Sequence, residues 1–188
     1  GTLVAASLVE AEKCYLYIRD EYYGLIKLIE NQIQILEENN LVSKGYLEIR
    51  RGAGAYICGE ESALIESIEG KRGLPRNRPP YVAEVGLFGR PTLVHNVETV
   101  FWIREIFEKG GEWFSSHGRN GRKGLRTYSV SGFVNKPGIV LTHAGTSVNQ
   151  IINEHCGGML EGHEFKGYLP GGASGGILPA SLGDIPLD

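Results

Sequence analysis

The first half of the chain alternates short runs of β-forming residues with longer stretches of helical spacing. The runs 14–19 and 47–51 are rich in aromatic and β-branched residues, which is typical of buried strands. Between them the pattern predicts an amphipathic helix over 22–39, because apolar side chains recur at helical steps at Leu25, Leu28, Ile29, Ile33 and Leu36. This order is the βαβ unit of an α/β sheet, and a shorter helix is expected at 2–13.

Helical spacing returns twice before the character of the chain changes. Helices are predicted over 60–68 and 92–107, with a loop rich in proline and arginine over 70–91 between them. Proline cannot continue a helix or a central strand, so this loop has no regular structure. A loop of that length inside a compact domain is usually functional.

A polar, glycine-rich and basic stretch then separates two parts of different character. We interpret 117–124 as a linker, which divides the chain into domains 1–116 and 125–188. Beyond the linker the pattern predicts two strands, a helix and a further strand, over 127–134, 139–142, 147–155 and 165–169. This order indicates a small β-grasp-like domain.

Composition narrows the class of protein. With 188 residues and a net charge of −3, the chain gives no electrostatic argument for binding nucleic acid. No apolar run approaches the roughly 20 residues of a membrane-spanning helix, and the start lacks the basic region of a signal peptide. We therefore expect no direct insertion into a membrane. Because the only methionine is Met159 and the start already reads as helix, we expect a fragment.

The number and spacing of the cysteines indicate the cellular compartment and limit the kinds of metal site that the chain can hold. Cys14, Cys58 and Cys156 are odd in number, far apart and outside any CxxC pair. This favours a reducing, cytoplasmic compartment over a disulfide framework. Three thiolates also fall short of a complete four-cysteine iron–sulfur cluster, and the histidines have no metal-ligand spacing, so no metal site is predicted within these residues.

The glycine-rich segment GAGAYICGEES follows a predicted strand and opens a predicted helix, which is the setting of a ligand-binding turn. Glycines allow positive φ angles and a close approach of the backbone to a ligand. The start of the helix is expected to offer N–H groups to a phosphate. The spacing differs from the dinucleotide fingerprint GxGxxG, and no Gly-Lys-Ser/Thr follows as in a P-loop.

Several side chains around this turn each have a structural and a functional interpretation. Glu60 and Glu61 either complement the helix dipole or accept hydrogen bonds from a ribose hydroxyl or an amide, since two acids beside a phosphate would be unusual. Asn96 either caps a helix or binds a phosphate. Tyr81 either stacks on a base or packs the loop. The basic side chains of the loop form either a solvated surface or a diphosphate or partner contact: Lys71, Arg72, Arg76 and Arg78.

The segments GAGAYICGEESALIES (52–67) and GKRGLPRNRPPYVAEVGLFGRPTLVHNVET (70–99) together resemble the FMN-binding flavoprotein subunit of NADH-quinone oxidoreductase, respiratory complex I. The same family includes flavin subunits of NAD-dependent formate dehydrogenases and NAD-reducing hydrogenases. The tail 125–188, with LPGGASGG, resembles the ubiquitin-like β-grasp (SLBB-type) domain of that family. The resemblance implies an α/β fold in which part of a Rossmann-like FMN-binding domain precedes the β-grasp domain.

The resemblance also implies chemistry and site residues. Family members bind FMN, receive a hydride from NADH stacked over the flavin, and pass single electrons to a [4Fe-4S] cluster. By motif, Glu61 is the catalytic candidate, and it lies along the flavin and nicotinamide with Tyr56, Gly59 and Glu60. Asn96 and Thr99 would contact the FMN phosphate and ribityl chain, and Tyr81 would stack on the adenine.

Other parts implied by the resemblance are expected outside these residues. A second glycine-rich FMN loop with its lysine would precede residue 1, and the cluster-binding segment would follow residue 188, so this fragment alone should bind FMN poorly. The implied partners are a thioredoxin-like [2Fe-2S] subunit and a large iron–sulfur subunit, with any membrane association arising through partners. The electron partner stays open between quinone, formate and hydrogen. A non-catalytic binding or assembly module of the same fold is the alternative from another class.

Overall fold

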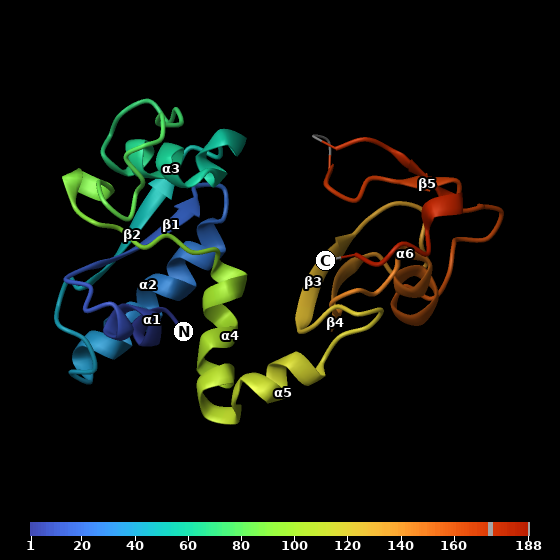
Figure 1. Cartoon of the computed structure of the whole chain (residues 1–188), viewed down its shortest axis with the longest axis horizontal. Coiled ribbons are helices and arrows are strands. Elements are labelled where there is room, and N and C mark those ends of the chain that lie inside the picture. The colour runs from blue at the N-terminus through green and yellow to red at the C-terminus, as the bar shows by residue number, and fades with distance from the viewer. Residues whose placement is uncertain (173–174, 188) are drawn as a thin grey trace. The chain divides into compact units, whose positions relative to one another are not determined.

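The computed structural model describes residues 1–172 and 175–187, so Ala173 and Ser174 of the LPGGASGG segment lie outside the described residues. The chain forms two compact units, Gly1–Arg104 and Glu105–Asp188 (Figure 1). Within the described part, no helix has the length and apolar character needed to cross a membrane. The domain limits at 116 and 125 stay a prediction.

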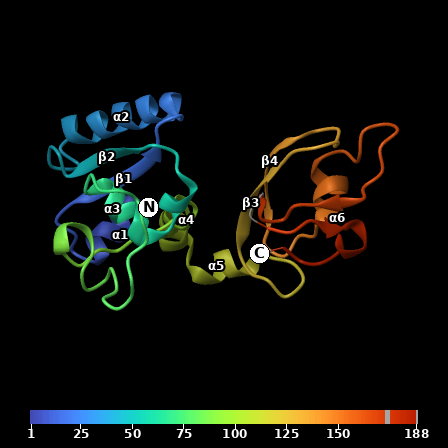
Figure 2. The same cartoon turned by 90° about the horizontal axis from the view of Figure 1, so that it is seen from above.

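The first unit contains the predicted βαβ element. Strands β1 (Cys14–Arg19) and β2 (Leu47–Gly52) pair in parallel and are connected by helix α2 (Tyr23–Glu38). Figure 2 shows α2 over one face of this sheet and helix α3 (Glu61–Ile68) over the other. The mixed helix and strand structure confirms the predicted α/β class of this unit.

Alternation along β1 places successive side chains on opposite faces, each with its own core. Cys14 and Leu47 pack with Ile33 of α2 in one cluster. Tyr15 packs against a second cluster that includes Ile65 of α3. The two clusters anchor α2 and α3 to the strands, and α3 therefore starts at a fixed place relative to the strand ends.

Two helices differ from their predicted limits. Helix α1 spans Thr2–Leu8 rather than 2–13, and Glu10 just beyond it adopts a left-handed φ of 51°, which no helix continues. Helix α4 spans Val97–Lys109 rather than 92–107. It cannot start earlier, because the Asn96 side chain accepts from the backbone N–H of Glu98 and so marks the N-terminal boundary.

Shorter helical elements also lie in the part of the chain that the structure describes. Helix α5 (Gly111–Ser116) follows α4 without having been predicted from the sequence. Single 3-10 turns lie at η1 (Tyr56–Gly59), η2 (Leu87–Gly89) and η5 (Ala180–Leu182).

In the second unit, β3 (Leu125–Val130) and β4 (Gly138–His143) form an antiparallel pair. The predicted strand 127–134 is therefore shorter at its end, because the chain leaves the ladder where Val130 pairs with Gly138. The predicted helix 147–155 is present as α6 (Val148–Gln150) continued by the wider π turn η3 (Ile151–His155), with Ser147 and Gln150 forming a capping box. Two short strands follow: β5 (Gly167–Tyr168) and β6 (Leu178–Pro179).

The stretch 117–124 is hydrogen-bonded to the connection after β4. The Arg119 N–H donates to the Ala144 carbonyl at 2.8 Å, and the Asn120 amide donates to the Gly145 carbonyl at 2.9 Å. The core of the unit lies beneath the hairpin and consists of Val134, Ile151, Ile152 and Cys156. The second unit thus includes this stretch in its packing.

Candidate functional site

The carboxyl ends of β1 and β2 meet at one edge of the sheet, beside α3 (Figure 1). Open α/β sheets bind their ligands at this edge. Gly54, just beyond β2, has a φ of +79°, and a Cβ there would lie 2.6 Å from Oε2 of Glu21. The turn therefore requires glycine, and Glu21 joins the site. Our sequence interpretation missed Glu21, although an acid shortly after the end of β1 was the available signal.

Glu60 is the N-cap of α3. Its Oε2 accepts from the backbone N–H groups of Ser62 at 3.0 Å and Ala63 at 2.9 Å, and from the Ser62 hydroxyl at 2.6 Å. Burial raises the pKa of Glu60, but the hydrogen bonds from Ser62, Ala63 and Arg78 outweigh it and lower the pKa to about 2. The helix-start interpretation of Glu60 is confirmed, and the carboxylate is ionised at every physiological pH.

The same contacts overturn the expectation that the start of α3 offers N–H groups to a phosphate. The N–H groups of Ser62 and Ala63 already donate to the Glu60 carboxylate. A phosphate there would have to displace this carboxylate and face its charge. Two of the N–H groups at the helix start are therefore already used within the protein.

Arg78 joins the two neighbouring glutamates. Its Nη2 lies 2.5 Å from Oε1 of Glu60 and 2.8 Å from Oε1 of Glu61. Arg78 is exposed, as the solvated-surface interpretation predicted, but it also pairs with both carboxylates of the turn. Two carboxylates and one guanidinium leave this cluster with a net negative charge, which suits hydroxyl and amide donors better than anions.

Arg76 connects α3 to the loop that follows. Its Nε donates to Glu66 at 2.5 Å and its Nη2 lies 3.2 Å from Glu69, while Nη1 donates to the carbonyls of Val85 and Gly86. Burial lowers the pKa of Arg76, but the bonds to Glu66 and Glu69 raise it overall. This guanidinium holds the loop against α3, and it is committed to that role.

Lys71 also pairs within the protein, with Glu69 at 2.7 Å. Burial raises the pKa of Glu69, but hydrogen bonds from Lys71, the Phe88 N–H and Arg76 lower it below its usual value. Of the four basic side chains considered from the sequence, Lys71, Arg76 and Arg78 thus have partners on α3 or immediately beside it.

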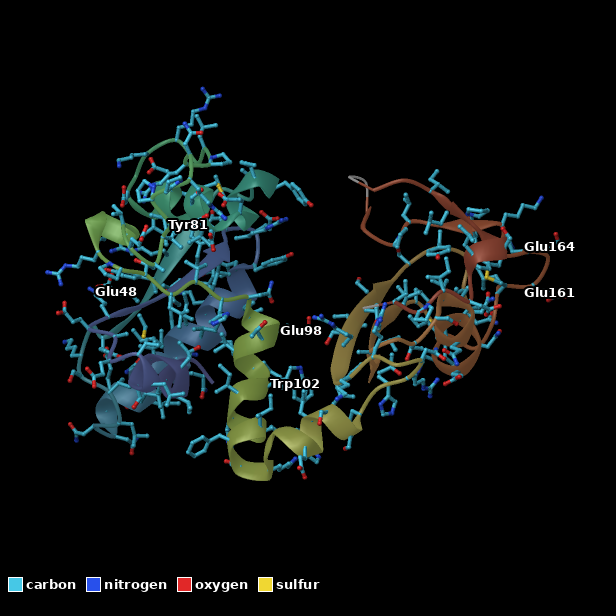
Figure 3. The ribbon with its side chains drawn as sticks, viewed as in Figure 1. Glu48, Tyr81, Glu98, Trp102, Glu161 and Glu164 are labelled. Atoms are coloured by element: carbon cyan, nitrogen blue, oxygen red, sulfur yellow. The ribbon has the colours of Figure 1, made fainter. Side chains whose placement is uncertain are left out.

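The remaining predicted site residues lie on η1, the loop and the start of α4. Tyr56 of η1 and Tyr81 of the loop are 76% and 56% exposed, so neither ring serves as core packing. Asn96 acts as the α4 cap, as its structural interpretation predicted, and Thr99 is exposed in the first turn. Figure 3 labels Tyr81 in the loop after α3 and Glu98 at the start of α4. The ligand contacts of these residues stay predictions.

Glu60 gives a prediction of acid sensitivity. Because its pKa is lowered from 4.5 to about 2 on folding, its stabilising effect is complete above pH 4.5 and is lost as the pH falls towards 2. With allowance for solvent screening, we expect the stability difference between the wild type and Glu60→Gln to shrink by about 1 kcal/mol from pH 6 to pH 3, measured by urea unfolding of the full-length subunit. Glu12→Gln, at a carboxylate 80% exposed, serves as the control and should change little. A pH-independent difference for Glu60→Gln would contradict the prediction.

Known proteins with similar sequences indicate the family of this chain. The family model of the Nuo51 FMN-binding domain matches residues 1–105. An NADH-quinone oxidoreductase subunit of Rhizobium meliloti is 40% identical over all of this chain and 47% of its own length. The mitochondrial NADH dehydrogenase [ubiquinone] flavoprotein 1 of Dictyostelium discoideum is 42% identical over all of this chain and 41% of its own length.

Two solved structures also match this chain over almost its whole length. An NAD⁺-reducing [NiFe]-hydrogenase in the air-oxidised state matches with a TM-score of 0.87 and 38% identity, covering 99% of this chain and 32% of that chain. The hydrogen-reduced state of such an enzyme matches with a TM-score of 0.86. The chain spans about half the length of the curated relatives that it matches.

Proposed function

Because the chain belongs to the family of the Nuo51 FMN-binding domain, we propose that it forms one wall of a site for FMN and NAD(H) in a flavoprotein subunit that passes a hydride between them. The observation that carries the proposal is the Glu60–Glu61–Arg78 cluster at the carboxyl ends of β1 and β2. Glu60 caps α3, but a scaffold of the same fold has no need for a second carboxylate, Glu61, at this edge, and this argues against a purely structural module.

The polar groups of this cluster suit the ribose and nicotinamide parts of these ligands, and they do not suit the phosphates. Glu21 and Glu61 offer carboxylate oxygens as acceptors for ribose hydroxyls and for the carboxamide of nicotinamide. A Cβ at Gly59 would meet nothing within 4 Å, so the backbone there is open to a flat ring. The cluster provides no unpaired cation for a phosphate, because Arg78 is held by the two glutamates. The phosphate end therefore requires residues outside the cluster.

Each predicted site residue has a proposed role in this arrangement. Tyr56 and Gly59 lie along the flavin, and Glu60 holds the turn that presents Glu61 to the nicotinamide. Asn96 and Thr99, at the start of α4, contact the FMN phosphate and ribityl chain, and Tyr81 stacks on the adenine. FMN, when bound, accepts a hydride from NADH and returns the electrons one at a time to an iron–sulfur acceptor. The residues of this chain would hold and orient both rings.

The domain organisation and partners follow the same proposal. We infer that the first unit is part of a Rossmann-like domain and that the hairpin, helix and short strands of the second unit form the β-grasp domain. The [4Fe-4S] cluster, the thioredoxin-like [2Fe-2S] subunit and the large iron–sulfur subunit belong to the complete assembly. Both quinone-linked and hydrogenase relatives match this chain, and formate is the further alternative, so the electron partner is left open.

Flavin absorbance of the full-length subunit tests the proposal. We expect an oxidised flavin band at roughly 450 nm that bleaches when NADH is added, because the proposed site brings the two rings together. Dithionite, which reduces flavin without a coenzyme site, is the control. A protein without flavin, or one whose flavin bleaches with dithionite and not with NADH, would contradict the proposed function and favour a binding or assembly module.

A further inference from the structure

Ser62, in the first turn of α3, makes two side-chain hydrogen bonds although it is only 1% exposed. Its hydroxyl donates to Oε2 of Glu60 at 2.6 Å and accepts from the backbone N–H of Arg76 at 2.8 Å. A hydroxyl has one donor and two acceptor lone pairs, so the same group can make both bonds at once. One buried side chain thus connects the cap of α3 to the loop that follows the helix.

The bond to the Arg76 backbone attaches this loop beside the first turn of α3. The Arg76 guanidinium attaches the loop elsewhere, because its partners Glu66 and Glu69 lie towards the C-terminal end of the helix. The two attachments are therefore independent of each other. Without the Ser62 hydroxyl, the Arg76 N–H would lose its acceptor and the loop would lose its backbone contact with the start of the helix.

Arg78 lies two residues beyond this attachment and reaches back to the same turn. Its Nη2 lies 2.5 Å from Oε1 of Glu60 and 2.8 Å from Oε1 of Glu61. The Arg78 side chain is long and 40% exposed, so the place of its guanidinium depends on where the loop backbone holds it. Burial raises the pKa of Glu60, and the Ser62 hydroxyl comes first among the groups that lower it to about 2. The hydroxyl therefore also favours the ionised carboxylate with which Arg78 pairs.

We infer that Ser62 is a positioning residue for the coenzyme site: its hydroxyl ties the Glu60 carboxylate to the loop at Arg76 and so holds Arg78 against Glu60 and Glu61. This inference rests on the proposed function for its effect on the coenzyme. Ser62 is too deeply buried to contact a coenzyme itself, so it acts through Arg78. A misplacement of about 1 Å can cost about 100-fold in rate, so a smaller shift of this cluster is enough to weaken coenzyme binding.

The first test compares Ser62→Ala with Ser67→Ala in the full-length subunit. Ser67 is a matched control, because it lies in the last turn of the same helix and its hydroxyl bonds the Tyr17 hydroxyl at 3.0 Å. For Ser62→Ala we expect the KM for NADH to rise about 3- to 10-fold with kcat within about twofold. Amide hydrogen exchange should accelerate over 62–64, because the cap carboxylate loses its hydroxyl donor. Ser67→Ala should change neither quantity.

A double variant tests the route through Arg78. Adding Ser62→Ala to Arg78→Gln should raise KM by less than about twofold beyond Arg78→Gln alone, because the group that Ser62 positions is already gone. A further rise of about twofold or more would show that Ser62 acts on NADH by another route, and it would overturn the inference.

The exchange and kinetic measurements separate the inference from the proposed function. Unchanged exchange over 62–64 in Ser62→Ala, or equal acceleration in Ser67→Ala, overturns the positioning role, whatever the kinetics. Faster exchange with an unchanged KM overturns the link to the coenzyme. If the wild type never responds to NADH, the proposed function is contradicted, and faster exchange confined to Ser62→Ala still supports the structural part. Faster exchange together with a raised KM, both absent from Ser67→Ala, supports the inference in full.

Discussion

Replacing Glu61 with glutamine in the full-length subunit is expected to lower kcat/KM for NADH by about 10- to 100-fold. A hydrogen bond to a charged group contributes about 1.5–3 kcal/mol, and its loss appears directly in kcat/KM. Glutamine keeps the shape of the side chain and removes its charge. The position of Glu61 beside Arg78, in the first turn of α3, is what makes the carboxylate available at the strand ends.

The competing explanation for Glu61 is a helix-start role, and it makes a different prediction. Loss of a dipole interaction would lower the stability by about 0.3–1 kcal/mol and leave NADH turnover near normal. Glu112→Gln is the matched control, because Glu112 also lies in the first turn of a helix, α5, in the second unit. If Glu61→Gln lowers the melting temperature while the fully folded variant keeps the wild-type kcat/KM for NADH, the helix-start role is correct and the proposed catalytic role of Glu61 is wrong.

Replacing Arg76 with leucine is expected to destabilise the subunit by roughly 2–3 kcal/mol. The side chains of Glu66 and Glu69 are only 18% and 8% exposed, and without Arg76 the cation beside them is Lys71, 3.8 Å from Glu66 and 2.7 Å from Glu69. The carbonyls of Val85 and Gly86 lose their donor as well. The measurement is urea unfolding of the full-length subunit at neutral pH.

An exposed ion pair provides the comparison for Arg76. Arg90 pairs with Glu12 at 2.6 Å, but the two side chains are 71% and 80% exposed, so Arg90→Leu should cost less than about 1 kcal/mol. Adding Glu66→Gln to Arg76→Leu should recover part of the loss, because Glu66 loses its 2.5 Å contact with Arg76 and keeps Lys71 only at 3.8 Å. Equal effects of Arg76→Leu and Arg90→Leu would show that the Arg76 network contributes little to stability.

The sequence predicted the central elements of the first unit well. Strand β1 was predicted with its observed limits, and α2 and β2 within a residue at each end. These elements follow from side-chain periodicity and local propensity, which act over a few residues. The predicted limits of α1 and α4 were wrong because of single residues. Glu10 adopts a left-handed φ beyond the end of α1, and Asn96 caps α4 later than predicted. The motif GAGAYICGEES was enough to locate the turn and to indicate the family.

The sequence correctly predicted a helix-start role for Glu60, but it wrongly predicted that the N–H groups there are available to a phosphate. Both outcomes have the same physical reason. The sequence identifies which residues can cap a helix, but it does not say whether the resulting N–H groups remain available. In the structure Glu60 occupies the groups of Ser62 and Ala63, and Arg78 reaches back across 18 residues to Glu60. That contact depends on the path of the loop, which no periodicity encodes.

The βαβ unit, the glycine-rich turn with its two carboxylates, and the family were all predictable from the order of the residues. How these parts meet depends on the folded chain: Glu21 beside Gly54, Arg78 between the two glutamates, and Arg76 between α3 and its loop. Secondary structure arises from hydrogen bonds between residues close in the chain, whereas these contacts join residues from different elements. Their geometry is set by the packing of α3 and its loop on the sheet, and the charge balance of the site is a result of that packing.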